Sequence, residues 1–378
     1  MSNPRVLFYT QHLLGIGHLS RAATLARGLA ARGFDVRLVS GGYPVAEVNV
    51  SDLDFVQLPP VRATDLHFRE LVDETGTPVD DQWKRRRRDA LLSVANDLRP
   101  HVVLTELFPF GRRQMRFELI PFLEAVVAQQ PRPLVVSSVR DILVEPSKPG
   151  RTQEMLDRIK RFYDLVLVHG DPNLIPFSRT FPRAAQLPSL RYTGYVVERG
   201  DVLDAPSRGR DVLVSAGGGA VALRLIDAVL AARELGGFGD RHVRILLGSA
   251  LPAEEFERLA SLNDERLTVE RARRDFRRLL REAALSISQG GYNTVMEVLD
   301  AKVPAIVVPY SGGVESEQTL RATLLAQRGA ITHVPEDTLD AHTLVQAVDS
   351  TLANGPSEFS LDVDGIAKTS KILHQLIA

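Results

Sequence analysis

Short apolar runs alternate with amphipathic stretches along almost the whole chain. In the first half, the runs expected to form buried strands are Arg5–Tyr9, Val36–Ser40, Phe55–Leu58, Val102–Thr105, Leu134–Ser138 and Leu165–Val168. Between them lie segments such as Ser20–Arg32 and Gln114–Gln129, whose apolar residues recur at helical spacing. Strands that alternate with helices in this way are typical of a parallel sheet with helices on both faces.

The alternation stops once and then begins again, which divides the chain. Arg199–Arg210 is polar and contains glycine and proline, so it predicts a linker. A second series of strands is expected at Asp211–Ser215, Val243–Gly248, Leu267–Val269, Leu285–Ser288 and Pro304–Val308. The sequence therefore predicts an α/β protein of two Rossmann-like, doubly wound domains, residues 1–198 and 211–378, joined by a linker at 199–210. From the architecture alone, the last helix, about Asp364–Leu376, is a candidate to pack back on the first domain.

Composition removes several classes of function. The 378 residues are 44% hydrophobic and 25% charged, with a formal net charge of −1, so no global field attracts nucleic acid. The chain has no cysteine, which excludes disulfides and thiolate catalysis. No apolar run approaches the roughly 18 residues of a membrane span, so no integral membrane segment is expected. A cytoplasmic protein is the simplest expectation.

The first strand leads into a glycine-containing turn, Gly15-Ile16-Gly17-His18. The Lys-Ser/Thr ending of a P-loop is absent, and no third glycine completes a dinucleotide fingerprint. Glycines allow a substrate to lie against the backbone, which makes Gly17 a candidate ligand contact. A histidine at a helix N-terminus is kept neutral by the helix dipole and can accept a proton, so His18 is the candidate catalytic base. The alternative is a purely structural turn in which His18 only caps the helix. His12, in the same turn, is a candidate on the acceptor side.

Two more glycine turns follow strands in the second half, Gly217-Gly218-Gly219 and Gln289-Gly290-Gly291. Backbone N–H groups in such turns, at the start of a helix, can cradle a diphosphate. Glu297 is expected one turn into the second of these helices, where a carboxylate can accept hydrogen bonds from the hydroxyls of a ribose. The spacing of Thr294 and Glu297 also fits a capping box, so capping and ribose binding remain alternatives.

At this point the residues show a resemblance. The pattern Ser-x-Gly-Gly-x-Asn-Thr-x-x-Glu at Ser288–Glu297, followed by Val-Pro-x-x-x-x-Pro and Glu317-Gln318, resembles the donor-binding region of GT-B glycosyltransferases. It is similar to UDP-sugar-dependent transferases, including the GlcNAc transferase of peptidoglycan synthesis. Gln-His-x-Leu-Gly-x-Gly-His at Gln11–His18 resembles a bacterial group of predicted glycosyltransferases. The resemblance is good over Gln11–Arg21 and Ser286–Arg321 and architectural elsewhere.

The resemblance implies two domains that face a central cleft, and a donor site in the second. The predicted donor-binding residues are Gly17, Gly217, Gly218, Gly219, Arg273, Gln289, Gly290, Gly291, Asn293, Thr294, Glu297, Glu317 and Gln318. In such enzymes the glycine loops and Asn293 line the diphosphate, and Glu297 binds the ribose. Glu317 and Gln318 match the pair that binds the donor sugar. The backbone of Arg273 matches a uracil contact, which makes UDP the favoured nucleotide.

In GT-B enzymes the first domain holds the acceptor. Glu106, Arg140 and Asp141 follow predicted strands, so with His12 they form the acceptor-side set, although helix capping and turn chemistry are the alternative. The basic run Trp83–Arg88 could bind an anionic acceptor or contact a membrane surface peripherally, but a solvated helix face is the favoured interpretation. The histidines are scattered and no metal-ligand set is recognised.

The leading hypothesis is an inverting, metal-independent glycosyltransferase in which His18 removes the acceptor's proton. The nucleotide-diphosphate sugar is a co-substrate, no cofactor is expected, and the acceptor is a small molecule or a glycan. A nucleotide-sugar hydrolase, in which His18 activates water, and a sugar-nucleotide epimerase are alternatives on the same fold. A non-catalytic protein that binds sugar nucleotides or glycans is the third possibility. No nucleic-acid partner is expected because the chain has no basic stripe interleaved with aromatics.

Overall fold

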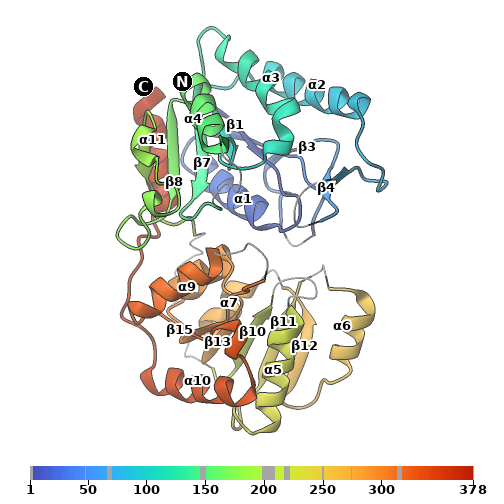
Figure 1. The fold of residues 1–378 in the computed structure, drawn as a ribbon, viewed down its shortest axis with the longest axis vertical. Coiled ribbons are helices and arrows are strands. Elements are labelled where there is room, and N and C mark those ends of the chain that lie inside the picture. The colour runs from blue at the N-terminus through green and yellow to red at the C-terminus, as the bar shows by residue number, and fades with distance from the viewer. Residues whose placement is uncertain are drawn as a thin grey trace. The chain divides into compact units, whose positions relative to one another are not determined.

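In a computed structural model, the chain forms two α/β units (Figure 1). The structure describes residues 3–46, 48–65, 70–144, 150–197, 209–216, 222–248, 251–273, 275–312 and 317–377. One unit comprises Met1–Glu198 together with Asp362–Ala378, and the other comprises Arg199–Leu361. Of the predicted linker, residues 199–208 lie outside the described residues, as do Gly217, Gly218 and Gly219.

The first unit is built on a seven-stranded sheet in which every described pair is parallel. Its strands are β1 (Arg5–Thr10), β2 (Asp35–Ser40), β3 (Asp54–Gln57), β6 (Val102–Glu106), β7 (Leu134–Arg140), β8 (Leu165–His169) and β9 (Leu190–Tyr192). A short antiparallel pair, β4 (Arg62–Ala63) and β5 (Leu71–Val72), stands apart from it. The strand order is β3-β2-β1-β6-β7-β8-β9, so the chain builds outward from β1 in one direction and from β6 in the other. The switch point between β1 and β6 is where sheets of this kind bind ligands.

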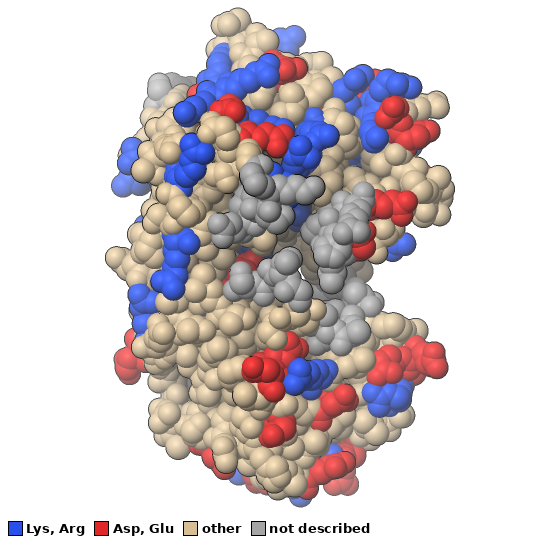
Figure 2. All heavy atoms as spheres, viewed as in Figure 1, with Lys and Arg blue, Asp and Glu red and all other residues tan. Residues whose placement is uncertain are grey.

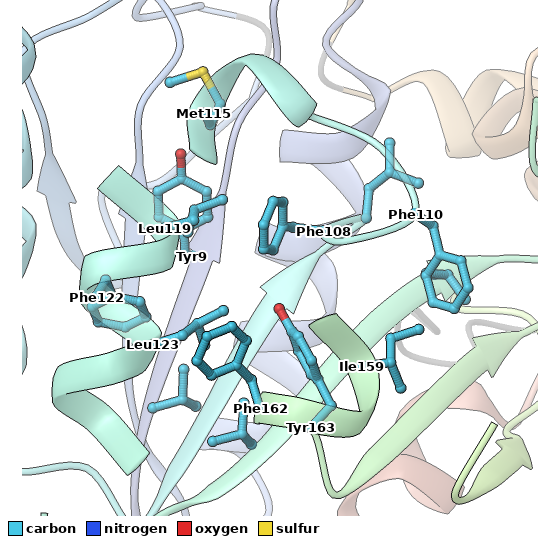
Figure 3. Close-up of a cluster of buried hydrophobic side chains, with 14 of the residues drawn as sticks. Tyr9, Phe108, Phe110, Met115, Leu119, Phe122, Leu123, Ile159, Phe162 and Tyr163 are labelled. Carbon is cyan, nitrogen blue, oxygen red and sulfur yellow. The ribbon is translucent and has the colours of Figure 1, made fainter. Parts of the chain in front are cut away.

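Helices cover both faces of this sheet because strand side chains alternate between them. The helices are α1 (Gly17–Ala30), α2 (Asp81–Leu98), α3 (Arg116–Val127), α4 (Arg151–Phe162) and α11 (Gly365–Ile377). Leu7 and Tyr9 of β1 belong to a core with residues of α2, α3 and α4, whereas Val6 and Phe8 belong to a second core with residues of α1 and α11. Figure 3 shows the first of these cores, with Tyr9 among apolar side chains from α3 and α4.

The helix α11 packs against α1 even though residues 199–361 separate it from the rest of its unit. Leu373 of α11 is fully buried in the same core as Leu25 and Leu29 of α1. A Cβ atom added to Gly28 would lie 2.2 Å from Cγ2 of Ile366, so the two helices approach closely at a glycine. The last helix therefore covers the helix that carries His18.

The second unit is built on a six-stranded parallel sheet with the order β12-β11-β10-β13-β14-β15. Its strands are β10 (Val212–Ala216), β11 (Val243–Leu247), β12 (Leu267–Arg271), β13 (Leu285–Ser288), β14 (Ala305–Val307) and β15 (Thr332–His333). Its described helices are α5 (Leu223–Glu234), α6 (Ala253–Ala260), α7 (Phe276–Glu282), α8 (Tyr292–Asp300), α9 (Glu317–Gln327) and α10 (Ala341–Asn354). The switch point lies between β10 and β13, the strands that precede the two predicted glycine cradles.

The basic run on α2 is not the uniformly solvated face that we expected. Figure 2 shows Lys and Arg side chains gathered over α2, but Arg87 is fully buried. Its Nε donates to Oε2 of the equally buried Glu118 at 2.6 Å. Trp83, Arg87 and Leu91 lie four residues apart along the helix and form its buried stripe. One arginine of the run therefore belongs to the core, because helical phase turns it inward.

Candidate functional site

The carboxyl ends of β1 and β6 bring His18 and Glu106 together at the switch point of the first sheet. His18 is the second residue of α1, Glu106 is the last residue of β6, and Nδ1 of His18 lies 2.9 Å from Oε1 of Glu106. A carboxylate only accepts hydrogen bonds, so Nδ1 carries the hydrogen and Nε2 holds a lone pair. The side chain of His18 is 11% exposed, and within the described ranges no group bonds to Nε2. The ring thus presents a basic nitrogen.

Glu106 is buried and surrounded by donors. Arg21, one turn along α1 from His18, donates to Oε1, and the hydroxyl of Ser138 donates to Oε2 at 2.9 Å. Burial alone raises the pKa of Glu106, but the charge of Arg21 and the hydrogen bond from His18 outweigh it and hold the pKa at about 2. The group is therefore a carboxylate at neutral pH, and its partners fix both oxygens.

His18 is neutral at pH 7 for electrostatic reasons. Burial lowers the pKa of the ring to about 3, the nearby guanidinium of Arg112 acts in the same direction, and Glu106 opposes them. Arg112 itself has a pKa lowered to about 10 by burial and then by Arg140, so it stays charged. Its Nε donates to the carbonyl of Gln11 at 2.6 Å, which ties the turn before α1 to the segment after β6. A neutral imidazole in a positive environment can accept a proton when a carboxylate stabilises the product.

The other acceptor-side candidates lie at the same edge, but two of them are engaged in holding its loops. Asp141 is fully buried and accepts from the hydroxyl of Tyr195 at 3.0 Å and from the N–H of Ile142 at 2.9 Å. His12 is 4% exposed, and its Nε2 lies 2.9 Å from the carbonyl oxygen of Tyr43.

Arg140, the last residue of β7, is partly exposed and donates from Nε to the carbonyl of Ile142 at 3.2 Å. Together with Arg112, which sequence reasoning missed, it supplies positive charge near His18.

Ser138 and His169 were also missed, and they stand at the ends of β7 and β8. Ser138 closes the predicted strand Leu134–Ser138, and His169 directly follows the predicted strand Leu165–Val168. Both are fully buried. A polar side chain at the end of a buried parallel strand was the signal available for each of them.

On the second unit, the turn between β13 and α8 has the geometry that a glycine requires. Gly290 has a φ of +78°, and a Cβ added there would lie 2.5 Å from Cγ1 of Val307. Gly291 is the N-cap of α8, so the cap position itself has no side chain to donate or accept a hydrogen bond. Thr294 is therefore the third residue of the helix rather than its cap, and the capping-box alternative is wrong. Glu297 lies further along α8, partly exposed, with Oε1 3.6 Å from Nε of Arg277.

The remaining donor-side residues lie around α8 and α9. Glu317 begins α9, is 3% exposed, and accepts from Arg321 at 2.8 Å, so its carboxylate is turned into the unit. Gln318 accepts from the N–H of Tyr310 at 3.2 Å and so supports the loop that precedes α9. Other donor-side candidates, partly exposed or nearly buried, are Asn293, Thr294 and Gln289. Gly17 is the exposed first residue of α1 in the other unit.

Arg273 pairs its side chain on the surface with Asp275 at 2.8 Å and with Glu270 at 3.3 Å. The side chain of Arg273 is thus held in ion pairs, so only its backbone remains a candidate contact to the nucleotide base.

The described residues contain no group of three or more His, Asp or Glu side chains arranged to hold a metal ion. Among their helices, none has the length and apolarity that a membrane span requires.

Comparison with known proteins identifies the second half of the chain. Residues 212–376 match the family described as the glycosyltransferase family 28 C-terminal domain. This segment belongs to that family. Curated relatives named UDP-N-acetylglucosamine–N-acetylmuramyl-(pentapeptide) pyrophosphoryl-undecaprenol N-acetylglucosamine transferase match parts of the chain. The protein of Prochlorococcus marinus is 32% identical over 94 residues, 25% of this chain and 26% of the relative. That of Thiobacillus denitrificans is 29% identical over 238 residues, 57% of this chain and 58% of the relative. The matches thus span between about a quarter and 58% of these relatives' lengths.

Solved structures resemble the chain over nearly its whole length. MurG of Acinetobacter baumannii has a TM-score of 0.56 at 17% identity, and the match covers 99% of both chains. The spinosyn rhamnosyltransferase SpnG, solved with thymidine diphosphate, has a TM-score of 0.58 at 19% identity over 99% of this chain and 96% of its own. These likenesses confirm the predicted GT-B fold. The recognition of a GT-B glycosyltransferase is therefore confirmed for the fold and for the family 28 domain.

Proposed function

We propose that the protein is an inverting, metal-independent glycosyltransferase that moves a sugar from a nucleotide-diphosphate donor to a small-molecule or glycan acceptor in the cytoplasm. The observation that carries the proposal is the hydrogen bond of 2.9 Å between Nδ1 of His18 and the Glu106 carboxylate. This hydrogen bond leaves Nε2 of His18 as a basic nitrogen at the switch point of the first sheet. The family 28 domain supports a sugar-nucleotide donor.

In the proposed reaction, an acceptor hydroxyl donates its hydrogen bond to Nε2 of His18. As the acceptor oxygen bonds to the anomeric carbon of the donor, its proton passes to Nε2 and the bond from that carbon to the diphosphate breaks. The nucleoside diphosphate leaves with the electron pair, and a single displacement inverts the anomeric centre. The Glu106 carboxylate stabilises the imidazolium that forms, as an orienting carboxylate does for other histidine bases.

On the donor side, the proposal assigns the diphosphate to the N–H groups at the start of α8, where Gly290 and Gly291 keep side chains away from the backbone. Glu297 is assigned to the ribose, a role that the loss of its capping-box alternative favours. UDP remains the favoured nucleotide because the curated relatives are named for a UDP-sugar. SpnG was solved with a different pyrimidine nucleotide, thymidine diphosphate.

The test begins with thermal unfolding in the presence of UDP, dTDP, GDP, CDP and ADP, each with EDTA. A nucleotide at about 100 times its dissociation constant adds about 2.7 kcal/mol, which raises the midpoint by a few degrees. His18→Ala is expected to keep this stabilisation and to lose transfer by about 10²–10⁴-fold. Absence of stabilisation by every nucleotide overturns the donor site. Release of free sugar at the same rate with and without acceptor would instead identify a hydrolase.

A further inference from the structure

A line of buried polar side chains continues behind Glu106, away from His18. The hydroxyl of Ser138 lies 2.9 Å from Oε2 of Glu106 and 3.0 Å from Nε2 of His169. Nδ1 of His169 lies 2.8 Å from the hydroxyl of Thr193. Glu106 is 1% exposed and the other three are fully buried. The line crosses the ends of three neighbouring strands, β6, β7 and β8, and Glu106 is in register with Ser138.

The hydrogens that Ser138 and His169 share along this line point toward Glu106. The Glu106 carboxylate only accepts, so the single hydroxyl hydrogen of Ser138 is donated to it. The lone pair of Ser138 then receives a hydrogen from Nε2 of His169. Burial, and after it Arg21, lowers the pKa of His169 to about 3, so the ring is neutral and carries only that one hydrogen. Its Nδ1 lies 2.8 Å from the hydroxyl of Thr193, which can also donate to the carbonyl of Gly194 at 2.8 Å. The hydrogens of His169 and Ser138 are both directed toward the carboxylate, an arrangement in which successive bonds strengthen one another.

We propose that Ser138 and His169 are positioning residues that hold the Glu106 carboxylate in the one rotation that orients His18. This inference rests on the proposed function of His18. The terminal torsion of a glutamate is soft, so the carboxylate keeps its rotation only if both oxygens are held. Oε1 is held by His18 and Arg21, and Oε2 by Ser138. Without Ser138, the plane of the carboxylate can turn, and Nδ1 of His18 loses the acceptor that fixes its hydrogen.

The charged and titratable groups around His18 and Glu106 come from each element that packs against them. Arg21 comes from α1, Arg112 from the segment after β6, Arg140 from the end of β7 and His169 from the end of β8. Within the part of the chain that the structure describes, Arg21 is the one residue besides His18 that forms an ion pair with Glu106. Ser138 is thus the neutral contact that sets the rotation of the carboxylate without changing its charge.

The test compares Ser138→Ala with Ser137→Ala. Ser137 is the adjacent residue of β7, is equally buried, and donates to the carbonyl of Phe108 at 2.9 Å. Ser137→Ala loses one buried hydrogen bond and Ser138→Ala loses two, each worth about 0.5–1.5 kcal/mol, so both variants should be destabilised, Ser138→Ala the more. Ser138→Ala is expected to lower kcat at least about tenfold, as loss of a group that orients a metal ligand does, with KM for donor and acceptor unchanged. Equal kcat values in the two variants overturn the proposal.

His169 provides a second comparison. In His169→Gln the amide N–H can still donate to Ser138, whereas His169→Leu removes the donor. We expect the leucine variant to lose kcat as Ser138→Ala does, and the glutamine variant to keep most of it. Equal losses in both overturn the assignment of a hydrogen-bonding role.

The ¹⁵N chemical shifts of His18 test the positioning without turnover. The wild-type ring is expected as the Nδ1–H tautomer, and Ser138→Ala as a mixture with the Nε2–H form. If the wild type transfers no sugar from any donor, the proposed function fails, while the tautomer ratio still decides the positioning. An unchanged tautomer in Ser138→Ala overturns it.

Discussion

Acidification from pH 8 to pH 5 is expected to lower the free energy of unfolding of the first unit by about 4 kcal/mol through two buried histidines. His12 and His101, whose pKa values burial also lowers, add to this loss. His18 and His169 each have a folded-state pKa of about 3, because both rings are buried. An unfolded histidine has a pKa near 6.5. Between these values the unfolded chain binds protons that the folded chain does not, so stability is complete above about pH 6.5 and falls as the pH decreases through the window. At pH 5 the difference is about 2 kcal/mol for each ring.

The fluorescence of a single tryptophan can be used to follow the unfolding of the first unit. Trp83 is the chain's single tryptophan, and the side chain is 5% exposed in the core of the first unit. Urea unfolding followed by its fluorescence at pH 5, 6, 7 and 8 therefore reads the unit that holds both histidines. His169→Gln removes one titrating ring and should reduce the pH-dependent loss by about 2 kcal/mol. His342→Gln, an exposed position on α10 of the other unit, is the matched control.

A free energy of unfolding that stays constant from pH 8 to pH 5 would contradict a folded-state pKa of about 3 for these two histidines. That pKa is equally contradicted for His169 if the wild type and His169→Gln lose the same amount, because the loss would then come from other groups. Glu106 does not interfere in this range, since its folded pKa of about 2 contributes only as the pH falls below about 4.5.

Three further predictions concern other parts of the molecule. Arg87→Met leaves the buried Glu118 carboxylate without its cationic partner and should cost about 3–5 kcal/mol, whereas Arg86→Met on the exposed face of α2 should stay within about 0.5 kcal/mol, both by Trp83 fluorescence. Glu297→Ala should weaken binding of the nucleoside diphosphate in calorimetry, while Thr294→Ala should leave the melting of the second unit unchanged; a loss of about 1 kcal/mol in Thr294→Ala would restore the cap. Transfer should be equally fast with and without EDTA, and recovery on adding Mg²⁺ after a loss would contradict the metal-independent mechanism.

The alternation of strands and helices was predictable because parallel strands buried on both faces have continuous runs of apolar residues in the sequence. Val102–Thr105 and Leu134–Ser138 differ from β6 and β7 only at their ends. The short edge strands β9 and β15 were not predicted, since two or three residues carry too little pattern.

The sequence predicted individual residues of the site but not the contacts between them. Glu106 was expected at the ligand-binding edge, yet its contact with His18 depends on β6 lying beside β1, which is a property of strand order. Arg87 was hidden in a run of like charge, and only its spacing from Trp83 and Leu91 distinguishes it. His169 follows its strand directly, and nothing local shows that its partner is Ser138, 31 residues earlier.

The position of α11 has a consequence for the biosynthesis of this protein. During translation, all of residues 199–361 emerge before Gly365–Ile377 do. The second unit can therefore complete its sheet while α1 still lacks the helix whose Leu373 shares its core with Leu25 and Leu29. Until then, the part of α1 that packs against α11 is uncovered in the nascent chain, a state in which partly folded proteins tend to aggregate. The unit that begins first at the ribosome is the one that finishes last.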